Sequence, residues 1–266
     1  MVLTTFMEQY GLAQSEDVIA QVKDIAESIT FNDPIQIGRY GELPQGNRKI
    51  EGVVLGDNSP TTRAAELIGQ IVVGLEKADP SVLTKRESWW SRYTGSAMTR
   101  RVAFFSSADS VDQLLEQVPE RIADMEVAIG ALMDMRKVYS MDLQHIRIHL
   151  TAGKFALSKM SSDTASSKGA AFGTEAPTER FARRLSHLAA MLATTELAMN
   201  QLTLAESNMI NMMDRLREVA SVLVPAWHHK RVALHLGTET DFEVVKAATQ
   251  AHDQLLSALK TISPSS

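Results

Sequence analysis

The sequence contains no cysteine among its 266 residues, and this absence excludes a group of chemistries. Disulfide bonds, zinc–thiolate sites, iron–sulfur clusters and cysteine nucleophiles all need a thiol. Methionine, in contrast, occurs 13 times. Thioethers can bind a soft metal, but they also fill cores adaptably. Because Met125, Met199, Met209 and Met213 fall on apolar positions of helical patterns, core filling is the favoured interpretation.

Strong charge, aromatic side chains and long hydrophobic runs are also scarce. The formal net charge is −5, which argues against a general nucleic-acid binder. The longest charge-free apolar stretch, 185–195, has 11 residues, whereas a membrane span needs about 20. The first residues lack the features of a signal peptide. We therefore expect a cytoplasmic protein.

The common signatures of enzymes are missing as well. The sequence has no P-loop, no GxGxxG, no HExxH, no GxSxG and no EF-hand loop. Nucleotide, dinucleotide, zinc-protease, hydrolase and calcium functions thus have no support from sequence motifs. We expect a protein that is not an enzyme and carries no cofactor.

Two long heptad patterns dominate the centre of the chain. Apolar residues spaced alternately by four and three run from Val111 to Leu150 and again from Phe181 to Leu223. This spacing predicts two long helices with coiled-coil-like seams. Pro119 predicts either a kink or a helix that starts there after a shorter one. Pro225 is expected to stop the second helix.

The connector between the two patterns, residues 159–177, is rich in Ser, Ala and Gly. A flexible connector lets two helices fold back as an antiparallel hairpin. We expect an all-α, elongated protein with a small N-terminal helical group and a C-terminal helix. The predicted parts are short helices in 1–80, a basic and aromatic joint in 81–105, the hairpin in 106–236 and the last helix in 237–266.

Three potential metal ligands follow one another on the first long helix. Asp142, His145 and His149 are spaced by three and four residues, which puts them on one side of a helix. His187 would lie about opposite His149 in a symmetric hairpin. The alternative, which we favour, is a solvated helix side with ordinary histidines beside the apolar seam.

A local basic segment stands out in this acidic chain. Residues 81–105 hold five basic residues against one acid, together with a third of the aromatic residues. The residues of interest are Lys85, Arg86, Trp89, Trp90, Arg92, Tyr93, Arg100 and Arg101. Such a mixture suits an anionic membrane surface or a protein partner. The alternative is a joint in which the aromatics pack between helices.

Three segments of the chain carry a resemblance to a known family. They read ITFNDPIQIGRYGELPQGNRKIEGVVLG, SWWSRYTGSAMTRRVAFF and SNMINMMDRLREVASVLVPAWHHKRVALHL. The chain resembles the toxic-anion (tellurite) resistance proteins of the TelA/KlaA type. The most specific match is an Asn-rich helix followed by Pro-x-Trp, represented by Asn208, Pro225 and Trp227. A Pro-Gln-Ile-Arg-like stretch of the family is replaced by Asn-Gln-Leu-Thr at 200–203.

The resemblance implies a cytoplasmic, helical, non-catalytic protein linked to tellurite resistance and envelope stress. We expect protein partners or other copies of the chain, and peripheral contact with the inner membrane face. Since the chain has no thiol, resistance is expected to be indirect. Two alternatives remain open: a coiled-coil scaffold unrelated to toxic anions, and a helical protein that binds a metal or an anion.

Overall fold

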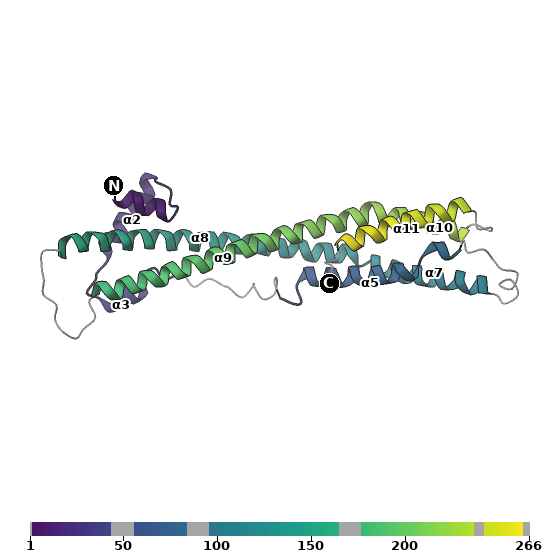
Figure 1. Cartoon of the computed structure of the whole chain (residues 1–266), viewed down its shortest axis with the longest axis horizontal. Helices are drawn as coiled ribbons and strands as arrows, with labels where there is room; N and C mark the ends of the chain where they lie inside the picture. The colour runs from purple at the N-terminus through teal and green to yellow at the C-terminus, as the bar shows by residue number, and fades with distance from the viewer. Residues whose placement is uncertain (1, 44–55, 84–95, 165–176, 237–241, 263–266) are drawn as a thin grey trace. The chain divides into compact units, whose positions relative to one another are not determined.

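The structure is a computed structural model that describes residues 2–43, 56–83, 96–164, 177–236 and 242–262. Every regular element in these ranges is helical (Figure 1), so the predicted all-α class is confirmed. The helices are α1 (Val2–Gln9), α2 (Glu16–Ser28), α3 (Pro34–Arg39), α5 (Pro60–Lys77), η2 (Pro80–Leu83), α7 (Ser96–Leu115), α8 (Val118–Thr164), α9 (Pro177–Glu218), η3 (Val219–Leu223), α10 (Val224–Leu236) and α11 (Phe242–Ile262). None of these described helices has the length and apolarity to cross a membrane.

The two longest helices, α8 and α9, have 47 and 42 residues and run antiparallel. Their direction follows from the contacts, because Arg147 pairs with Glu196, whereas Gly153, further along α8, faces Leu185. The predicted hairpin is thus confirmed. Of the two alternatives at Pro119, the second is right: α7 ends at Leu115 and α8 begins at Val118.

The chain forms two compact units, and both long helices contribute to each. Unit 1 consists of residues 1–48 and 133–204, and unit 2 of residues 49–132 and 205–266. This division differs from the domain boundaries expected from the sequence, because residues 1–80 are divided between the units. In addition, α8 continues to Thr164, into the range expected to be connector.

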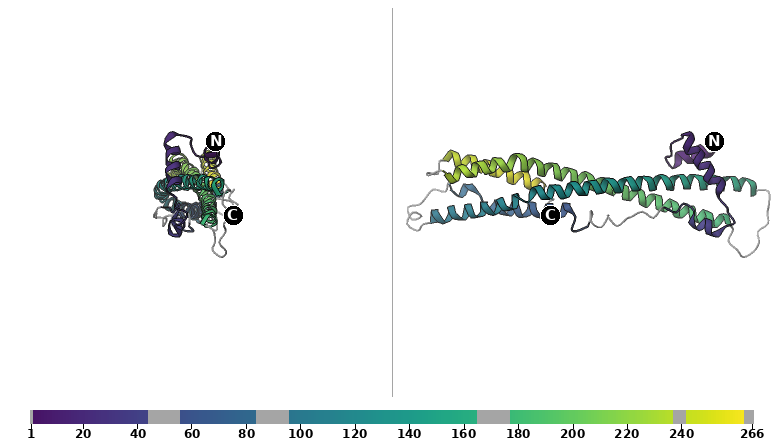
Figure 2. Two further views of the ribbon diagram at one scale, coloured as in Figure 1. Left: turned by 90° about the vertical axis from the view of Figure 1, so that its left-hand side faces the viewer. Right: turned by 180° about the vertical axis from the view of Figure 1, so that it is seen from behind.

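Unit 1 is built on the hairpin. Leu143, Ile146 and Leu150 of α8 pack against Phe181, Leu185, Leu188 and Leu192 of α9. The N-terminal helices cover this pair (Figure 2): Val22 of α2 packs on Ile148 and Ala152 of α8. Ile37 of α3 is buried in the hairpin core.

Unit 2 packs α5, α7, α10 and α11 together. Phe104 of α7 is buried with Leu234 of α10 and with Val245 and Ala248 of α11. An ion pair of 2.7 Å between Lys260 and Glu76 links α11 to α5. Met125, Met209 and Met213 are all buried in this unit, so their predicted role as core residues is confirmed.

Pro225 does not stop the second long helix, and the expectation that it would is wrong. A π-helical segment, η3, follows α9 directly, and α10 begins at Val224 without a break. Proline in a helix lacks an N–H and clashes with the carbonyl four residues before it. The wider π turn immediately before Pro225 relieves this clash, so the helical path continues.

Candidate functional site

The first family-like segment forms a short helix held by its cap. Asp33 precedes α3, and its carboxylate accepts hydrogen bonds from the backbone N–H groups of Ile35 and Gln36, at 2.9 and 3.2 Å. Pro34 occupies the first helical position, where its missing N–H costs nothing. This capping fixes where α3 starts and therefore where Tyr40 lies at its end.

Tyr40 attaches α3 to both helices of the hairpin. Its hydroxyl donates a 2.8 Å hydrogen bond to the carbonyl of His149 on α8. On the α9 side, Nε of Arg184 donates a 2.8 Å bond to the carbonyl of Tyr40, and the Tyr40 ring lies edge-on to Phe181 with centroids 4.9 Å apart. Burial raises the pKa of the Tyr40 phenol, so it remains a neutral donor.

Gly41, the next residue, is required for two reasons. Its φ of 66° lies in the left-handed region that favours glycine. A Cβ at this position would also lie 2.7 Å from Cδ1 of Leu188 and 3.4 Å from Cβ of His149. The Tyr-Gly pair is therefore the point at which the N-terminal segment locks into the hairpin.

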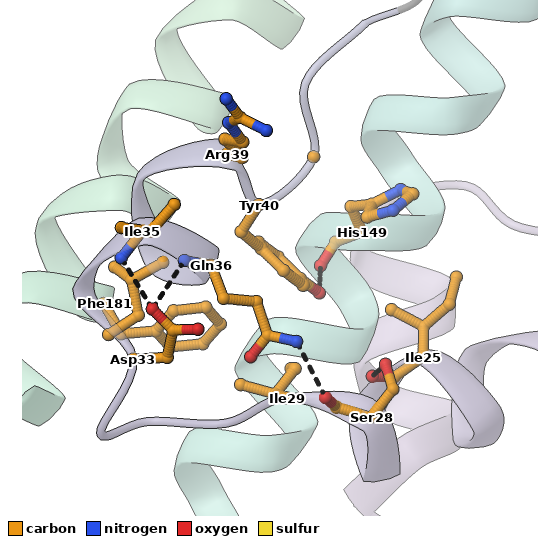
Figure 3. A pocket seen from close by; sticks show the side chains of 12 residues that line it. Ile25, Ser28, Ile29, Asp33, Ile35, Gln36, Arg39, Tyr40, His149 and Phe181 are labelled. Carbon is orange, nitrogen blue, oxygen red and sulfur yellow. Dashed lines mark hydrogen bonds between the residues drawn. The ribbon is translucent and has the colours of Figure 1, made fainter.

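This docked segment encloses a cavity of about 440 Å³ in unit 1 (Figure 3). The cavity is lined by Ile25, Ser28, Ile29, Asp33, Ile35, Gln36, Ile37, Arg39, Tyr40, Gly41, His149 and Phe181. Ile35 is 69% exposed, and Arg39 is exposed at the end of the same helix. The cavity thus has a lining of both apolar and polar residues, with an exposed cation, Arg39, and the carboxylate of Asp33.

Three polar side chains of the cavity, those of Gln36, Asp33 and Tyr40, already form hydrogen bonds within the protein. Nε2 of Gln36 donates to the carbonyl of Ser28 at 3.3 Å, and its Oε1 accepts from the N–H of Thr30 at 2.7 Å. The carboxylate of Asp33 caps α3, and the Tyr40 hydroxyl is bonded to α8. Such a site suits an apolar side chain with a neighbouring acidic group that can reach Arg39.

The four predicted metal ligands do not come together. The rings of His145 and His149 are stacked, with centroids 4.0 Å apart, and Nδ1 of His149 lies 2.9 Å from the carbonyl of His145. Asp142 is buried, whereas His187 is exposed. In the part of the chain that the structure describes, no three His, Asp or Glu residues form a group that could hold a metal ion. Burial lowers the pKa of His149, which favours its neutral form.

Most of the predicted basic and aromatic patch lies outside the described residues: Lys85, Arg86, Trp89, Trp90, Arg92 and Tyr93. Of its last two members, Arg100 lies on α7 beside Arg101. The guanidinium of Arg101 donates to the carbonyl of Leu234 at 3.3 Å and lies 5.8 Å from the ring centroid of Phe105. Arg101 therefore packs α7 against α10, while the role of the patch as a whole stays a prediction.

The Pro-x-Trp motif belongs to a structural cluster in unit 2. Trp227 is 2% exposed, and the guanidinium of Arg231 lies 5.5 Å from its ring centroid. Arg231 forms ion pairs with Asp109, at 2.7 Å, and with Asp112, both on α7. Pro225 is the second residue of α10, the helix that carries these residues, and Asn208 is exposed on α9. The motif thus fixes α10 to α7.

Several residues of the site were not predicted as such from the sequence: Gln36 and Phe181, which line the cavity, and Arg184, which binds the carbonyl of Tyr40. One local signal was available. Asp33 followed by Pro34 is typical of a helix start and could have located α3. The partners of Tyr40 on α8 and α9 carry no such signal, because their importance comes from contacts between distant parts of the chain.

The segments that resemble proteins of the TelA/KlaA type contribute the Tyr-Gly pair of unit 1 and the buried Pro-x-Trp motif of unit 2. The comparison with known proteins agrees: the chain is 29% identical over 245 residues to Protein KlaA from Escherichia coli, a match that covers 91% of this chain and 94% of the relative. No family model matches the chain, and no solved structure matches it significantly. The resemblance predicted from the sequence is thereby confirmed.

Proposed function

We propose that this protein contributes to tellurite resistance by binding a protein partner through the Tyr40 cavity, without acting on the anion itself. The relationship to KlaA supports the link to resistance. The absence of cysteine supports an indirect role, because a reductive reaction with tellurite needs thiols or a redox cofactor. The protein would act in the cytoplasm, and contact of segment 81–105 with the inner membrane face stays an additional prediction.

The main support for the proposal is that the residues around the cavity are held in place by contacts with the hairpin. Tyr40 is bonded to both α8 and α9, and Gly41 leaves no space between the segment and the hairpin. Binding a partner to such a rigid surface requires little ordering of the protein. Ile35, which is 69% exposed, then remains available at the edge of the cavity.

The two side chains at the edge of the cavity, Ile35 and Arg39, indicate which groups the partner should present. Ile35 and Arg39 are four residues apart on α3, so they lie on the same side of the helix. An apolar residue beside an arginine is a typical centre of a protein interface. The partner should therefore present an apolar side chain for the cavity and an acidic side chain for Arg39.

The proposal is tested by survival on tellurite. A strain that lacks the gene should survive less well, and the parent gene should restore survival. A variant carrying Ile35→Asp and Arg39→Glu should fail to restore it, because the edge of the cavity becomes acidic. The matched control is Val73→Asp, which changes an apolar residue that is 50% exposed on α5 and should restore survival fully.

Two outcomes would overturn the proposal. If the cavity variant is present at normal levels and restores full survival, the cavity does not bind the partner. If loss of the gene leaves survival unchanged, the protein has no role in resistance, and a scaffold of the coiled-coil type becomes the better explanation.

A further inference from the structure

An open groove of about 840 Å³ runs along one face of α11 in unit 2. Its lining residues on α11 recur at intervals of three and four, so they share one side of the helix. They are Phe242, Val245, Lys246, Thr249, Gln250, Asp253, Gln254, Ser257 and Ala258, and Ser81 of η2 completes the lining. We call this surface the α11 groove.

The apolar end of the α11 groove is formed by Phe242, the first residue of α11, which is 65% exposed. One turn further on, Val245 is buried in the cluster that contains Phe104. The hydroxyl of Thr249 and the amide of Gln250 follow along the same face. Such a surface suits Trp and Tyr, because their rings bury apolar area while their N–H and O–H groups bond to polar neighbours.

Segment 84–95, which lies outside the described residues, begins beside this groove. It follows directly on Leu83 of η2, and Ser81 of the same short helix lines the groove. Leu83 packs against the cluster that contains Val245 of α11. The chain therefore enters the segment next to the Phe242 end of the groove.

The segment is also much longer than the path between its ends. Leu83 packs against the cluster of Phe104, and Phe104 follows Ser96, the first residue of α7, by about 12 Å along the helix axis. The twelve residues 84–95 span up to about 40 Å when extended. The segment thus has the length to pass over the α11 groove and return to the start of α7.

The side chains of the segment match those of the groove. Trp89, Trp90 and Tyr93 supply three aromatic rings within five residues. The charged side chains of the segment are Lys85, Arg86, Glu87 and Arg92. The groove carries one charge of each sign, Asp253 and Lys246, so both kinds of charge have a counterpart.

We propose that segment 84–95 of the same chain occupies the α11 groove, with Trp89 and Trp90 against the ring of Phe242. The short connection through Leu83 keeps the segment at a high effective concentration near the groove. A membrane or a second protein would have to compete with this contact for the same aromatic rings. Contact of the segment with a membrane would therefore require its release from the groove.

Tryptophan fluorescence of the full-length protein tests the proposal. The chain has three tryptophans, so Trp227→Phe leaves the emission to Trp89 and Trp90. This pair should emit at a shorter wavelength than N-acetyltryptophanamide in water, and acrylamide should quench it several-fold less. Emission and quenching equal to those of the free compound would overturn the proposal.

Substitutions in the groove show whether it is the surface that shields the pair. In the Trp227→Phe background, Phe242→Lys with Gln250→Lys should raise quenching to the level of the free compound. The matched control, Val73→Lys with Gln70→Lys, changes an exposed apolar residue and an exposed glutamine of α5, both outside the groove. It should leave quenching unchanged, and so low a value in the groove variant as well would overturn the proposal. Circular dichroism checks that each variant keeps its helix content.

The absence of cysteine permits an independent measurement of proximity. Ser91→Cys with Gln250→Cys should be joined within one chain by a short bis-maleimide, at a yield that does not depend on protein concentration. Ser91→Cys with Gln70→Cys is the control and should give far less of this product. Equal yields from the two pairs would contradict the proposed position of the segment.

Vesicles that contain phosphatidylglycerol distinguish the groove from a membrane surface. Adding them should leave the emission of Trp89 and Trp90 unchanged. A pair that is exposed in solution and becomes shielded only with vesicles would overturn the proposal and assign the segment to a membrane surface. Since none of these measurements involves tellurite or the Tyr40 cavity, their outcome is independent of the proposed function.

Discussion

The hydroxyl of Tyr40 donates a 2.8 Å hydrogen bond to the backbone carbonyl of His149, a residue 109 positions further along the chain. This bond joins the end of α3 to the middle of α8, and the ring of Tyr40 packs edge-on against that of His149, with centroids 5.4 Å apart. This phenol therefore joins α3 directly to α8, which makes it the first target for mutation.

Replacing Tyr40 with Phe should lower the free energy of unfolding by about 0.5–1.5 kcal/mol, the usual net contribution of one hydrogen bond. The ring would keep its packing, so the loss reports the hydroxyl alone. Chemical denaturation measures it. Tyr10 offers the matched control, because it packs against the same core and its hydroxyl has no hydrogen bond within the described residues. Equal effects of Tyr40→Phe and Tyr10→Phe would contradict the prediction.

Gly41→Ala adds only one methyl group, but it should lower the free energy of unfolding substantially. A non-glycine residue in the left-handed region costs about 1–2 kcal/mol, and the added Cβ would meet Leu188 at 2.7 Å. Thermal unfolding should show the loss.

Gly38→Ala is the control for this substitution. Gly38 lies in α3, and a Cβ there would meet no atom within 4 Å. Alanine at a compatible helical position stabilises a protein by about 0.4–1 kcal/mol. The two alanine substitutions, three residues apart, should therefore change the midpoint of unfolding in opposite directions. A similar loss for both would show that Gly41 has no special role.

The parts that the sequence predicted well are those determined by local periodicity. The apolar steps of four and three predicted both long helices and the antiparallel hairpin, because burying such a seam requires a second helix. Pro225 was misjudged because its effect depends on the π turn before it, and no residue pattern of the sequence marks that turn. A helix can accommodate a proline when the preceding turn is wider.

The cavity was harder to predict than the helices. The Tyr-Gly pair lies in a segment that only the family resemblance singled out, since its partners His149 and Leu188 lie more than a hundred residues away. For the predicted metal site, the positions along the helix were predicted correctly, but the arrangement of the side chains was not. Its spacing of three and four residues placed the histidines correctly on one side of α8, but spacing cannot show that the two rings stack on each other.

The protein should lose stability in mild acid. Burial lowers the pKa of both His149 and His252 below the ordinary value of 6.5. The unfolded chain therefore binds protons at a higher pH than the folded one. As the pH decreases below about 6.5 towards the lower pKa values of the two histidines in the folded state, the free energy of unfolding falls. Urea denaturation at a series of pH values measures this slope.

Substitution of these histidines by Gln should make the pH dependence weaker, because Gln does not titrate. His229→Gln provides the control, because it makes the same substitution at an exposed position on α10. An unchanged slope in the variant with both His149→Gln and His252→Gln would show that other groups cause the acid sensitivity.

Arg231→Met should destabilise unit 2 by about 1.5–3 kcal/mol, the range for hydrogen bonds to charged groups. The side chains of Arg231 and Asp112 are only 17% and 16% exposed, and burial raises the pKa of Asp112. Removal of the cation therefore leaves a poorly solvated carboxylate.

Lys260→Met is the control, because it removes an ion pair with Glu76 in which both side chains are about half exposed. It should lower the free energy of unfolding by at most about 1 kcal/mol. Adding Asp112→Asn to Arg231→Met should recover part of the loss, because the unpaired charge disappears. If Arg231→Met costs no more than Lys260→Met, the cluster around Trp227 is held by packing rather than by its ion pairs.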